Sequence, residues 1–231
     1  MNNDSFVEKV KLFLKKQPWV FSTINRLMTP SWSGVSAKKV IRDIPKGAVI
    51  LNLGSGVTRI RPDVTNVDFY PFEGVDVVAD ISKLPFEDGS ADAVICECVL
   101  EHVLNPTVVV SEMHRVMKKG AVVYVIVPFV FPFHSSPDDF NRWSRMGLRE
   151  LFRDFDEVDS GIHFGAGHAV CWILSEYLGT ILSFGLKTLQ NIFFMVFLVL
   201  FTPLNYLDFI LNKFKTSGNI ASHIYFLGRK K

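Results

Sequence analysis

The sequence predicts an α/β fold built on a mostly parallel, doubly wound sheet. Short apolar runs of strand length recur between residues 49 and 128, and several of them end at an acidic residue. The first run stops at two glycines one residue apart. A helical pattern separates the last two runs, as expected where a crossover joins parallel strands.

The first run, Val49 to Leu53, is followed by Gly54, Ser55 and Gly56. Because two of these positions carry no side chain, the backbone can come very close to a ligand there. The pattern indicates a loop that binds a nucleotide-type cofactor, or else a plain tight turn.

Three further runs lie at residues 64–70, 75–80 and 91–96. Asp68 lies near the end of the first, where an acid can accept hydrogen bonds from both hydroxyls of a bound ribose. Asp80 ends the next run, and Glu97 follows the last. This order of elements favours the cofactor interpretation of the glycine loop.

The later elements follow from capping residues and periodicity. Asn105 and Pro106 suit the start of a helix, and Lys118 to Gly120 suit its end. We expect a buried strand at 121–128, a helix at 146–155, a strand at 155–164 and a final strand at 222–229.

The motifs as a set resemble the class I S-adenosylmethionine-dependent methyltransferases, in the branch that acts on small molecules, sugars and lipids. They are L-N-L-G-S-G at 51–56, N-V-D at 66–68, the run 79–95, V-L-E-H-V at 99–103 and E-M-H-R-V-M-K-K-G at 112–120. The resemblance covers residues 47 to about 155. It implies a Rossmann-like seven-stranded sheet with helices on both faces, an antiparallel last strand and S-adenosyl-L-methionine as the cofactor.

The resemblance also implies roles for individual residues. The glycine loop passes under the methionine part of the cofactor, Asp68 holds the ribose, and Asp80 and Ile81 flank the adenine. The implied cofactor set is Asn52, Gly54, Ser55, Gly56, Asp68, Phe69, Asp80, Ile81 and Glu97, with Glu101 and His102 beside the substrate.

Three positions depart from the family pattern. Asn52 stands where an acid is usual, and Thr58 stands where a third glycine is usual. Only about seven residues separate Gly56 from Val64, too few for a crossover helix. These departures predict a neutral partner for the methionine amino group and a weaker cofactor site, or a scaffold protein without turnover.

The loop at 129–144 leaves the carboxyl end of the fifth predicted strand, where doubly wound sheets bind their ligands. Methyl transfer to oxygen needs a base, and His134 is our candidate because a histidine can accept a proton at neutral pH. Asp139 and Arg142 are candidate substrate contacts. In the alternative, His134 only hydrogen-bonds the loop, and Asp139 and Arg142 form an ion pair that holds it shut.

A long apolar segment precedes the final strand. Residues 188–207 carry no charge and reach the length that spans a bilayer, but Pro203 predicts a break. Since the strands before and after this segment share one sheet, a single span would fail. We expect a hairpin or an interfacial helix at a membrane, with Lys213 and Lys215 near lipid head groups. The alternative is a buried helix or a dimer interface.

These elements predict an amphipathic helical segment at 1–45, which suits a membrane surface or a lid over the site, and a methyltransferase core at 46–167. An apolar helical insertion at 168–215 and a final strand at 216–231 complete the chain. A net charge of +2 gives no support for a nucleic-acid partner. No histidine and acid cluster has ligand spacing, so the sequence predicts no metal centre. The oligomeric state is left open.

The favoured function is O-methylation of a lipid-linked sugar, a lipid or another amphipathic small molecule on the cytoplasmic side of a membrane. The alternative is a cytoplasmic small-molecule methyltransferase whose apolar segment forms a pocket or dimer interface. Three cysteines without metal spacing fit a reducing compartment in either case.

Overall fold

The computed structural model of the chain describes residue 30, residues 34–134 and residues 138–231. Most of the helical segment predicted at 1–45 therefore lies outside the described residues. The chain divides into two compact units, and each is described by itself. The sheet unit holds residues 34–129, 133–163 and 223–231, and the helical unit includes residues 130–132 and 164–222.

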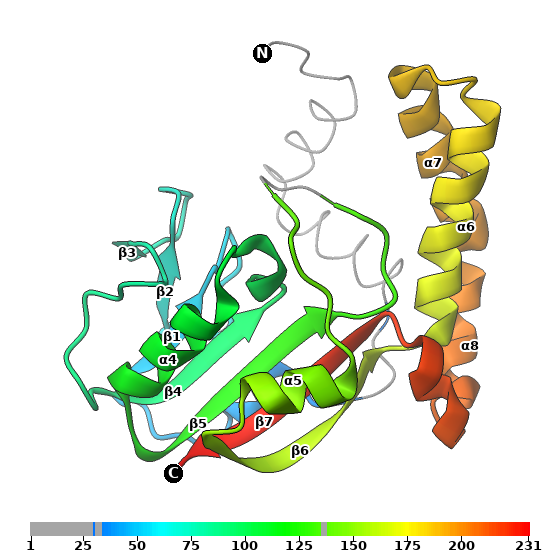
Figure 1. Ribbon diagram of the computed structural model, residues 1–231. Helices are drawn as coiled ribbons and strands as arrows, with labels where there is room; N and C mark the ends of the chain where they lie inside the picture. The colour runs from blue at the N-terminus through cyan, green and yellow to red at the C-terminus, as the bar shows by residue number, and fades with distance from the viewer. Residues whose placement is uncertain (1–29, 31–33, 135–137) are drawn as a thin grey trace. The chain divides into compact units, whose positions relative to one another are not determined.

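Seven strands form one sheet in the order β3-β2-β1-β4-β5-β7-β6 (Figure 1). Strands β1 to β5 pair in parallel, and β7 runs antiparallel to β5. The predicted seven-stranded sheet with an antiparallel last strand is confirmed, although β3 is only two residues long. The strands are β1 (Ile50–Leu53), β2 (Thr65–Asp68), β3 (Val77–Val78), β4 (Ala91–Glu97), β5 (Met117–Pro128), β6 (Phe155–Phe164) and β7 (His223–Lys230).

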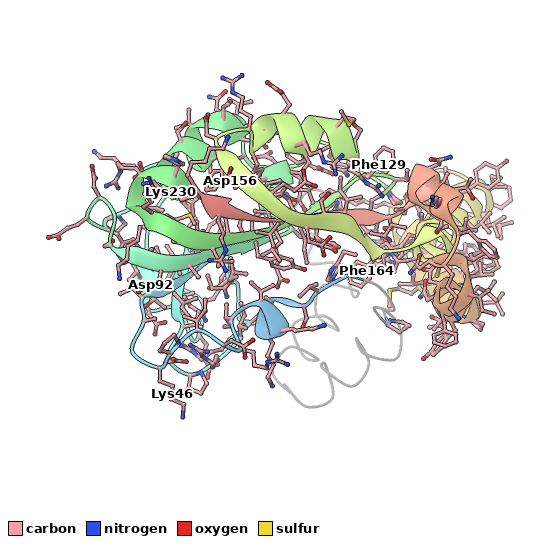
Figure 2. All side chains as sticks on the ribbon, turned by 90° about the horizontal axis from the view of Figure 1, so that it is seen from below. Lys46, Asp92, Phe129, Asp156, Phe164 and Lys230 are labelled. Carbon is pink, nitrogen blue, oxygen red and sulfur yellow. The ribbon has the colours of Figure 1, made fainter. Side chains whose placement is uncertain are left out.

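Helices cover both faces of this sheet, as predicted. Helices α4 (Pro106–Val116) and α5 (Arg145–Leu151) lie on one face, and the short α3 (Ala37–Val40) lies on the other (Figure 2). A short 3₁₀ turn, η1 (Leu100–His102), follows β4. No helix occurs in the described connection from β1 to β2, which confirms the shortened first crossover.

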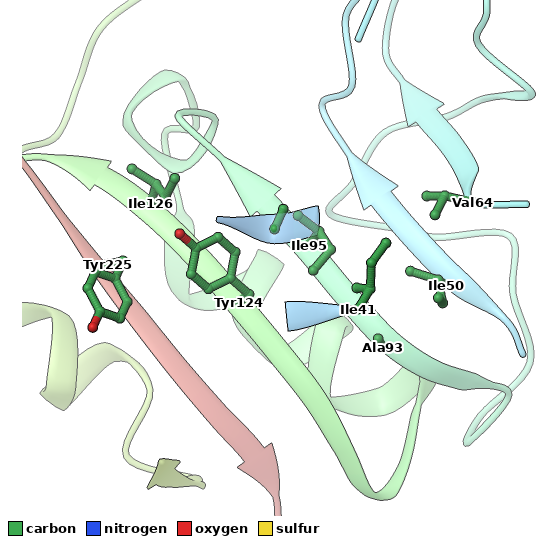
Figure 3. Close-up of a cluster of buried hydrophobic side chains, with 9 residues drawn as sticks. Ile41, Ile50, Val64, Ala93, Ile95, Tyr124, Ile126 and Tyr225 are labelled. Atoms are coloured by element: carbon green, nitrogen blue, oxygen red, sulfur yellow. The ribbon is translucent and has the colours of Figure 1, made fainter. Parts of the chain in front are cut away.

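A buried apolar cluster lies on the α3 face of the sheet (Figure 3). Ile41, directly after α3, packs against Ile50 of β1, Ile95 of β4 and Tyr124 of β5, and none of these side chains is exposed. Each such side chain stabilises the fold by roughly 1.5–3 kcal/mol when fully buried. The cluster therefore fixes β1 and β4, whose carboxyl ends carry the candidate site.

Helix α4 ends earlier than predicted. It begins at Pro106 after Asn105, as expected, but its last residue is Val116. Met117 already pairs with Ala91 of β4, and the register then shifts before Ala93 meets Val122. The intervening residues 118–120 form an irregular start to β5, with Gly120 at φ 76°. Pairing with β4 outweighs the local preference for a helix end at these residues.

The helical unit is a hairpin of α6 (Ala166–Leu182) against α7 (Lys187–Phe201) and α8 (Pro203–Leu211), followed by a 3₁₀ segment, η2 (Lys215–Ile220). The break predicted at Pro203 is confirmed, since α7 and α8 meet there at 46°. Among the described residues no one helix has the length and hydropathy to cross a bilayer, and only the bent pair α7 and α8 reaches both together.

Candidate active site

The glycine loop follows β1 and lies directly against the turn after β4. Gly54 has φ +66°, and its N–H donates to the carbonyl of Val67 at 2.8 Å. A Cβ on Gly54 would stand 2.3 Å from Cγ2 of Val99, so only glycine fits. Gly56 has φ +52° but faces open space, with no atom of the described residues within 4 Å of a Cβ placed there. The second glycine therefore leaves a cradle that a cofactor can fill.

Asp68 ends β2 beside this loop and is nearly fully buried. One carboxylate oxygen accepts the N–H of Gly56 at 2.8 Å, and the other accepts the N–H of Tyr70 at 2.9 Å. Each oxygen keeps a lone pair for a second donor, such as a ribose hydroxyl. Asp68 therefore shapes the loop, and its contact with a ribose stays a prediction.

Exposed aromatic side chains follow Asp68 in the sequence. Phe69 is 63% exposed and makes an edge contact with Tyr70, which in turn packs against Phe72. Farther along, Asp80 is exposed and accepts the N–H of Ser82, while Ile81 is buried. Phe69 can stack on a planar base, whereas Asp80 shapes its own turn.

Asn52 has a different setting from the one that the resemblance implies. Its side-chain amide donates to Oδ1 of Asn66 at 3.0 Å and to the carbonyl of Thr58 at 3.3 Å. Asn66 donates in turn to Thr58 and Gly74. Asn52 is therefore part of a buried amide network that holds the shortened connection from β1 to β2, and its role toward the cofactor stays a prediction.

Sequence reasoning missed Arg59, which strengthens the same connection. Its guanidinium pairs with Asp76 at 2.8 Å and donates to the carbonyls of Val64 and Gly74. The pair replaces a crossover helix as the support of the loop. The one sequence signal for this ion pair is the short segment from Gly56 to Val64, which leaves no room for a crossover helix to stabilise the loop.

The end of β4 carries a carboxyl group in an unusual setting. Burial raises the pKa of Glu97 to about 7. Cys98, the next residue, adopts φ +54°, a conformation that costs a residue with a side chain of the order of 1 kcal/mol. The strained residue turns the chain from β4 into η1, which carries Glu101 and His102.

Glu101, His102 and His134 meet in what we call the acid–histidine cluster. Oε1 of Glu101 lies 3.9 Å from Nε2 of His102 and 3.8 Å from Nε2 of His134. Glu101 is fully buried, and neither of its carboxylate oxygens has a hydrogen-bond partner among the described residues. Burial is the main cause that raises the pKa of Glu101, to about 7. The sequence analysis assigned His134 a different role from Glu101 and His102, and the fold brings all three side chains together.

Asp139 and Arg142 lie beside this cluster and form an ion pair, as the alternative interpretation of this loop expects. Arg142 Nη2 donates to Oδ2 of Asp139 at 2.6 Å, and the same oxygen accepts the N–H of His134 at 2.8 Å. Burial raises the pKa of Asp139, but the bonds from Arg142 and His134 outweigh it and lower the pKa to about 2. Asp139 is therefore a fixed anion that anchors the loop, and a substrate role for it and Arg142 stays a prediction.

Comparison with known proteins gives one family and many structures. Residues 52–125 match the family model for a methyltransferase domain, a span that runs from Asn52 in β1 to Val125 in β5 and includes the glycine loop, Asp68 and Glu101. A search of curated proteins returned no match.

Three solved structures illustrate the shared fold. The 1,6-didemethyltoxoflavin-N1-methyltransferase of Burkholderia thailandensis, with bound S-adenosylhomocysteine, has a TM-score of 0.54 at 13% identity, over 97% of this chain and 87% of that one. Phosphoethanolamine N-methyltransferase 2 of Haemonchus contortus, in complex with S-adenosyl-L-methionine, has a TM-score of 0.52 at 14% identity, over 83% and 51%. The cyclase SpnF has a TM-score of 0.53 at 14% identity, over 84% and 79%.

The match to SpnF shows that the fold alone does not fix the reaction, so the assignment depends on the site as well. Here the family match covers the glycine loop, and that loop leaves open space at Gly56 beside the buried carboxylate of Asp68. The family match, the fold and this site identify residues 52–125 as a class I S-adenosylmethionine-dependent methyltransferase domain, whose cofactor is S-adenosyl-L-methionine.

Proposed function

We propose that the enzyme methylates a hydroxyl oxygen of an amphipathic small molecule, a lipid or a lipid-linked sugar, while its helical unit lies in a membrane. The observation that carries the proposal is the composition of the helical unit, whose interior is small and polar and whose exterior is large and apolar. A water-soluble helix bundle has the opposite arrangement.

The interior of the hairpin is lined by small residues of α6. Gly167, Cys171, Ser175 and Gly179 recur every four residues and are all buried. A Cβ on Gly167 would stand 2.1 Å from the carbonyl oxygen of Leu204 in α8. Close backbone approach over small residues is the packing that helices use where lipid removes the hydrophobic driving force between them.

Buried polar groups complete this interior. The carboxylate of Asp208 accepts the N–H groups of Gly167 at 2.7 Å and His168 at 3.1 Å, and so caps the first turn of α6. Farther along, the amide of Gln190 donates to Glu176 at 2.8 Å. Within the hairpin the described acids are therefore satisfied by neighbouring helices, as required of polar groups in a hydrocarbon environment.

The outer surface of the hairpin is apolar, and the most exposed apolar side chains lie at its tip. Phe184 at the turn is 87% exposed, and Leu186 is 63% exposed. The other exposed apolar side chains include Val170, Ile173, Tyr177, Ile181, Leu182, Ile192, Val196, Val199, Leu200, Tyr206, Leu207, Phe209 and Ile210. A surface of this kind is much larger than monomeric soluble proteins expose, which supports contact with lipid.

The two ends of the hairpin adjoin, since Ser222 N–H donates to the carbonyl of Gly165 at 3.2 Å. A hairpin of this kind returns the chain to the side it left, whereas a single span would not. Helix α6 has 17 residues, about 25 Å in length, which is less than the roughly 30 Å of a bilayer core. We therefore favour an element that dips into one membrane face from the cytoplasmic side, and the three free cysteines support that compartment.

The chemistry follows from the residues of the sheet unit. S-adenosyl-L-methionine supplies a methyl group on a positively charged sulfur. The glycine loop, Asp68 and Phe69 would hold and orient it. As the acceptor oxygen is methylated, its hydroxyl proton would pass to the acid–histidine cluster, with Nε2 of His134 as the receiving atom.

Membrane association is tested by flotation of the purified chain with vesicles of neutral and anionic lipid. We expect the wild type to float and the double variant Phe184→Asp, Leu186→Asp to stay in the aqueous fraction. Met146→Asp is the matched control, because Met146 is 69% exposed but lies on α5 in the sheet unit. Equal flotation of both variants would contradict insertion by the hairpin tip.

The acceptor class is tested by radiolabelled methyl transfer into lipid extracts from cells that overproduce the chain. Label in a lipid or glycolipid fraction, lost on Asp68→Ala, would support the proposal, and label only in water-soluble products would contradict it. The same exposed helices also favour a second candidate, a small-molecule methyltransferase that dimerises through them. Recovery as a dimer without detergent or lipid would favour that candidate.

A further inference from the structure

The acid–histidine cluster brings three electron-pair donors face to face. One possible ligand atom from each of Glu101, His102 and His134 lies within 4.8 Å of the other two. Oε1 of Glu101 is 3.9 Å from Nε2 of His102 and 3.8 Å from Nε2 of His134. The two imidazole rings meet edge to face, with their centres 5.1 Å apart. The question is what lies between these three atoms when the protein is at neutral pH.

The tautomer of His102 follows from its other nitrogen. Nδ1 contacts the carbonyl oxygen of Asp138 in a short hydrogen bond. Because a carbonyl can only accept, Nδ1 carries the proton, and a neutral His102 has its lone pair on Nε2, toward Glu101.

His134 faces a carboxylate through its other ring nitrogen. Its Nδ1 lies 3.4 Å from Oδ2 of Asp139, an anion fixed by Arg142. A carboxylate on that side favours the tautomer with the proton on Nδ1, which again directs the lone pair of Nε2 toward Glu101. Two lone pairs then face a buried carboxylate whose oxygens accept no hydrogen bond from the described residues. Such an arrangement is repulsive when Glu101 is ionised, and a metal cation at the centre removes the repulsion.

We propose that Glu101, His102 and His134 bind one divalent transition-metal ion, such as Zn²⁺ or Mn²⁺, with an open position for the acceptor oxygen. Two imidazoles and one carboxylate are a common ligand set for such ions, whereas Mg²⁺ and Ca²⁺ prefer oxygen ligands alone. The backbone carbonyl of Asp138 and the carboxylate of Asp139 behind the two rings are the orienting partners that metal-binding histidines use.

The spacing permits an ion with a small contraction. From the three separations, a point about 2.5 Å from each ligand atom exists even when the two nitrogens are the full 4.8 Å apart. Ordinary zinc–nitrogen and zinc–oxygen distances are about 2.0–2.2 Å. Each side chain therefore moves by a few tenths of an ångström to close on the ion.

The inference rests on the proposed function in one respect, the assignment of the open position to the acceptor hydroxyl. A hydroxyl bound to a divalent cation loses its proton much more readily than a free one. His134 would then be a ligand, and the proton of the acceptor would leave to solvent as its oxygen binds the ion. In a metal-free chain His134 remains the proton acceptor.

The test is metal retention by the full chain, purified without a histidine tag, stripped with chelator and dialysed against micromolar Zn²⁺ or Mn²⁺. We expect elemental mass spectrometry to find one metal ion per chain. The metal affinity should fall at least tenfold in Glu101→Gln and in His134→Ala. His114→Gln is the matched control, because His114 lies on α4 outside the cluster. No stoichiometric ion in the wild type, or equal retention in Glu101→Gln, would overturn the inference.

Further measurements distinguish a loss of metal binding from a loss of folding or of activity. Glu101→Gln should unfold no more readily than the stripped wild type, because it removes a buried charge without a partner; S-adenosylhomocysteine titration checks that the variant keeps its cofactor site. Methyl transfer that persists in chelator would contradict the assignment of the open position to the acceptor hydroxyl and leave the proposed function in place. Stoichiometric metal without transfer to any amphipathic acceptor would contradict the proposed function only.

Discussion

The contact between Gly54 and Val99 allows a quantitative test of how the glycine loop is built. Gly54 and Gly56 both have positive φ, so an alanine at either position costs roughly 1–2 kcal/mol of folding free energy. Only the Gly54→Ala methyl collides, at 2.3 Å from Cγ2 of Val99, and ordinary contact needs about 1 Å more. Overpacking of this kind adds about 1–3 kcal/mol. We therefore expect losses of about 2–5 kcal/mol for Gly54→Ala and 1–2 kcal/mol for Gly56→Ala.

The assay is urea unfolding of both single variants, of Val99→Ala and of the double variant Gly54→Ala, Val99→Ala. Trimming Val99 removes both colliding γ carbons and leaves its Cβ at 3.1 Å from the new methyl. The double variant should recover at least about 1 kcal/mol relative to the sum of the single losses. Equal losses for Gly54→Ala and Gly56→Ala, together with additive behaviour of the double variant, would refute the packing argument.

Three further variants test the acids of the two units. Asp68→Asn should weaken S-adenosylhomocysteine binding at least tenfold by calorimetry, about 1.4 kcal/mol, because one acceptor of the loop and of the ribose is lost; unchanged affinity would contradict this. Burial raises the pKa of Glu97 to about 7 from an ordinary 4.5, so the folded chain loses stability as the pH rises from about 4.5 through 7. Glu97→Gln should therefore match the wild type in urea unfolding at pH 4.5 and exceed it by up to about 3 kcal/mol at pH 8.5, and a constant difference between the two pH values would be inconsistent with this. Asp208→Ala should destabilise the hairpin by about 1–2 kcal/mol through loss of the α6 cap, measured by hydrogen exchange of the first turn of α6, whereas Ser144→Ala at the cap of α5 should leave that turn unchanged.

The strands were predictable because their sequence pattern and their environment agree. Ile50 and Ile95 lie in continuous apolar runs and become fully buried, as parallel strands covered on both faces require. The end of α4 was not predictable from local signals, since Lys118 and Gly120 suit a helix terminus and the pairing of Met117 with Ala91 is a tertiary contact. A local preference worth a few tenths of a kcal/mol yields to a paired strand.

The acid–histidine cluster could not be predicted for a related reason. Glu101 and His102 follow β4, while His134 lies in the loop after β5, and no spacing rule links the two segments. They meet because β4 and β5 are neighbours in the sheet and because the loop bonds back, with the N–H of Phe140 donating to the carbonyl of Glu101 at 2.7 Å. The spacing of ligand residues within one segment can reveal a site on a helix or a hairpin. It cannot reveal a site whose residues come from two loops that lie far apart in the sequence.

Asn52 is the departure from the family pattern for which the structure gives the clearest reason. Its amide donates to Asn66 at 3.0 Å and to the carbonyl of Thr58 at 3.3 Å, and both partners are acceptors. A carboxylate of the same shape cannot donate to either, so Asn52→Asp, which restores the acid usual in the family, would bury a charge against two oxygens. We expect a loss of at least about 2 kcal/mol in urea unfolding and no gain in S-adenosylhomocysteine affinity. Tighter cofactor binding by Asn52→Asp without loss of stability would mean that position 52 faces the cofactor, and that the amide network does not need its donor.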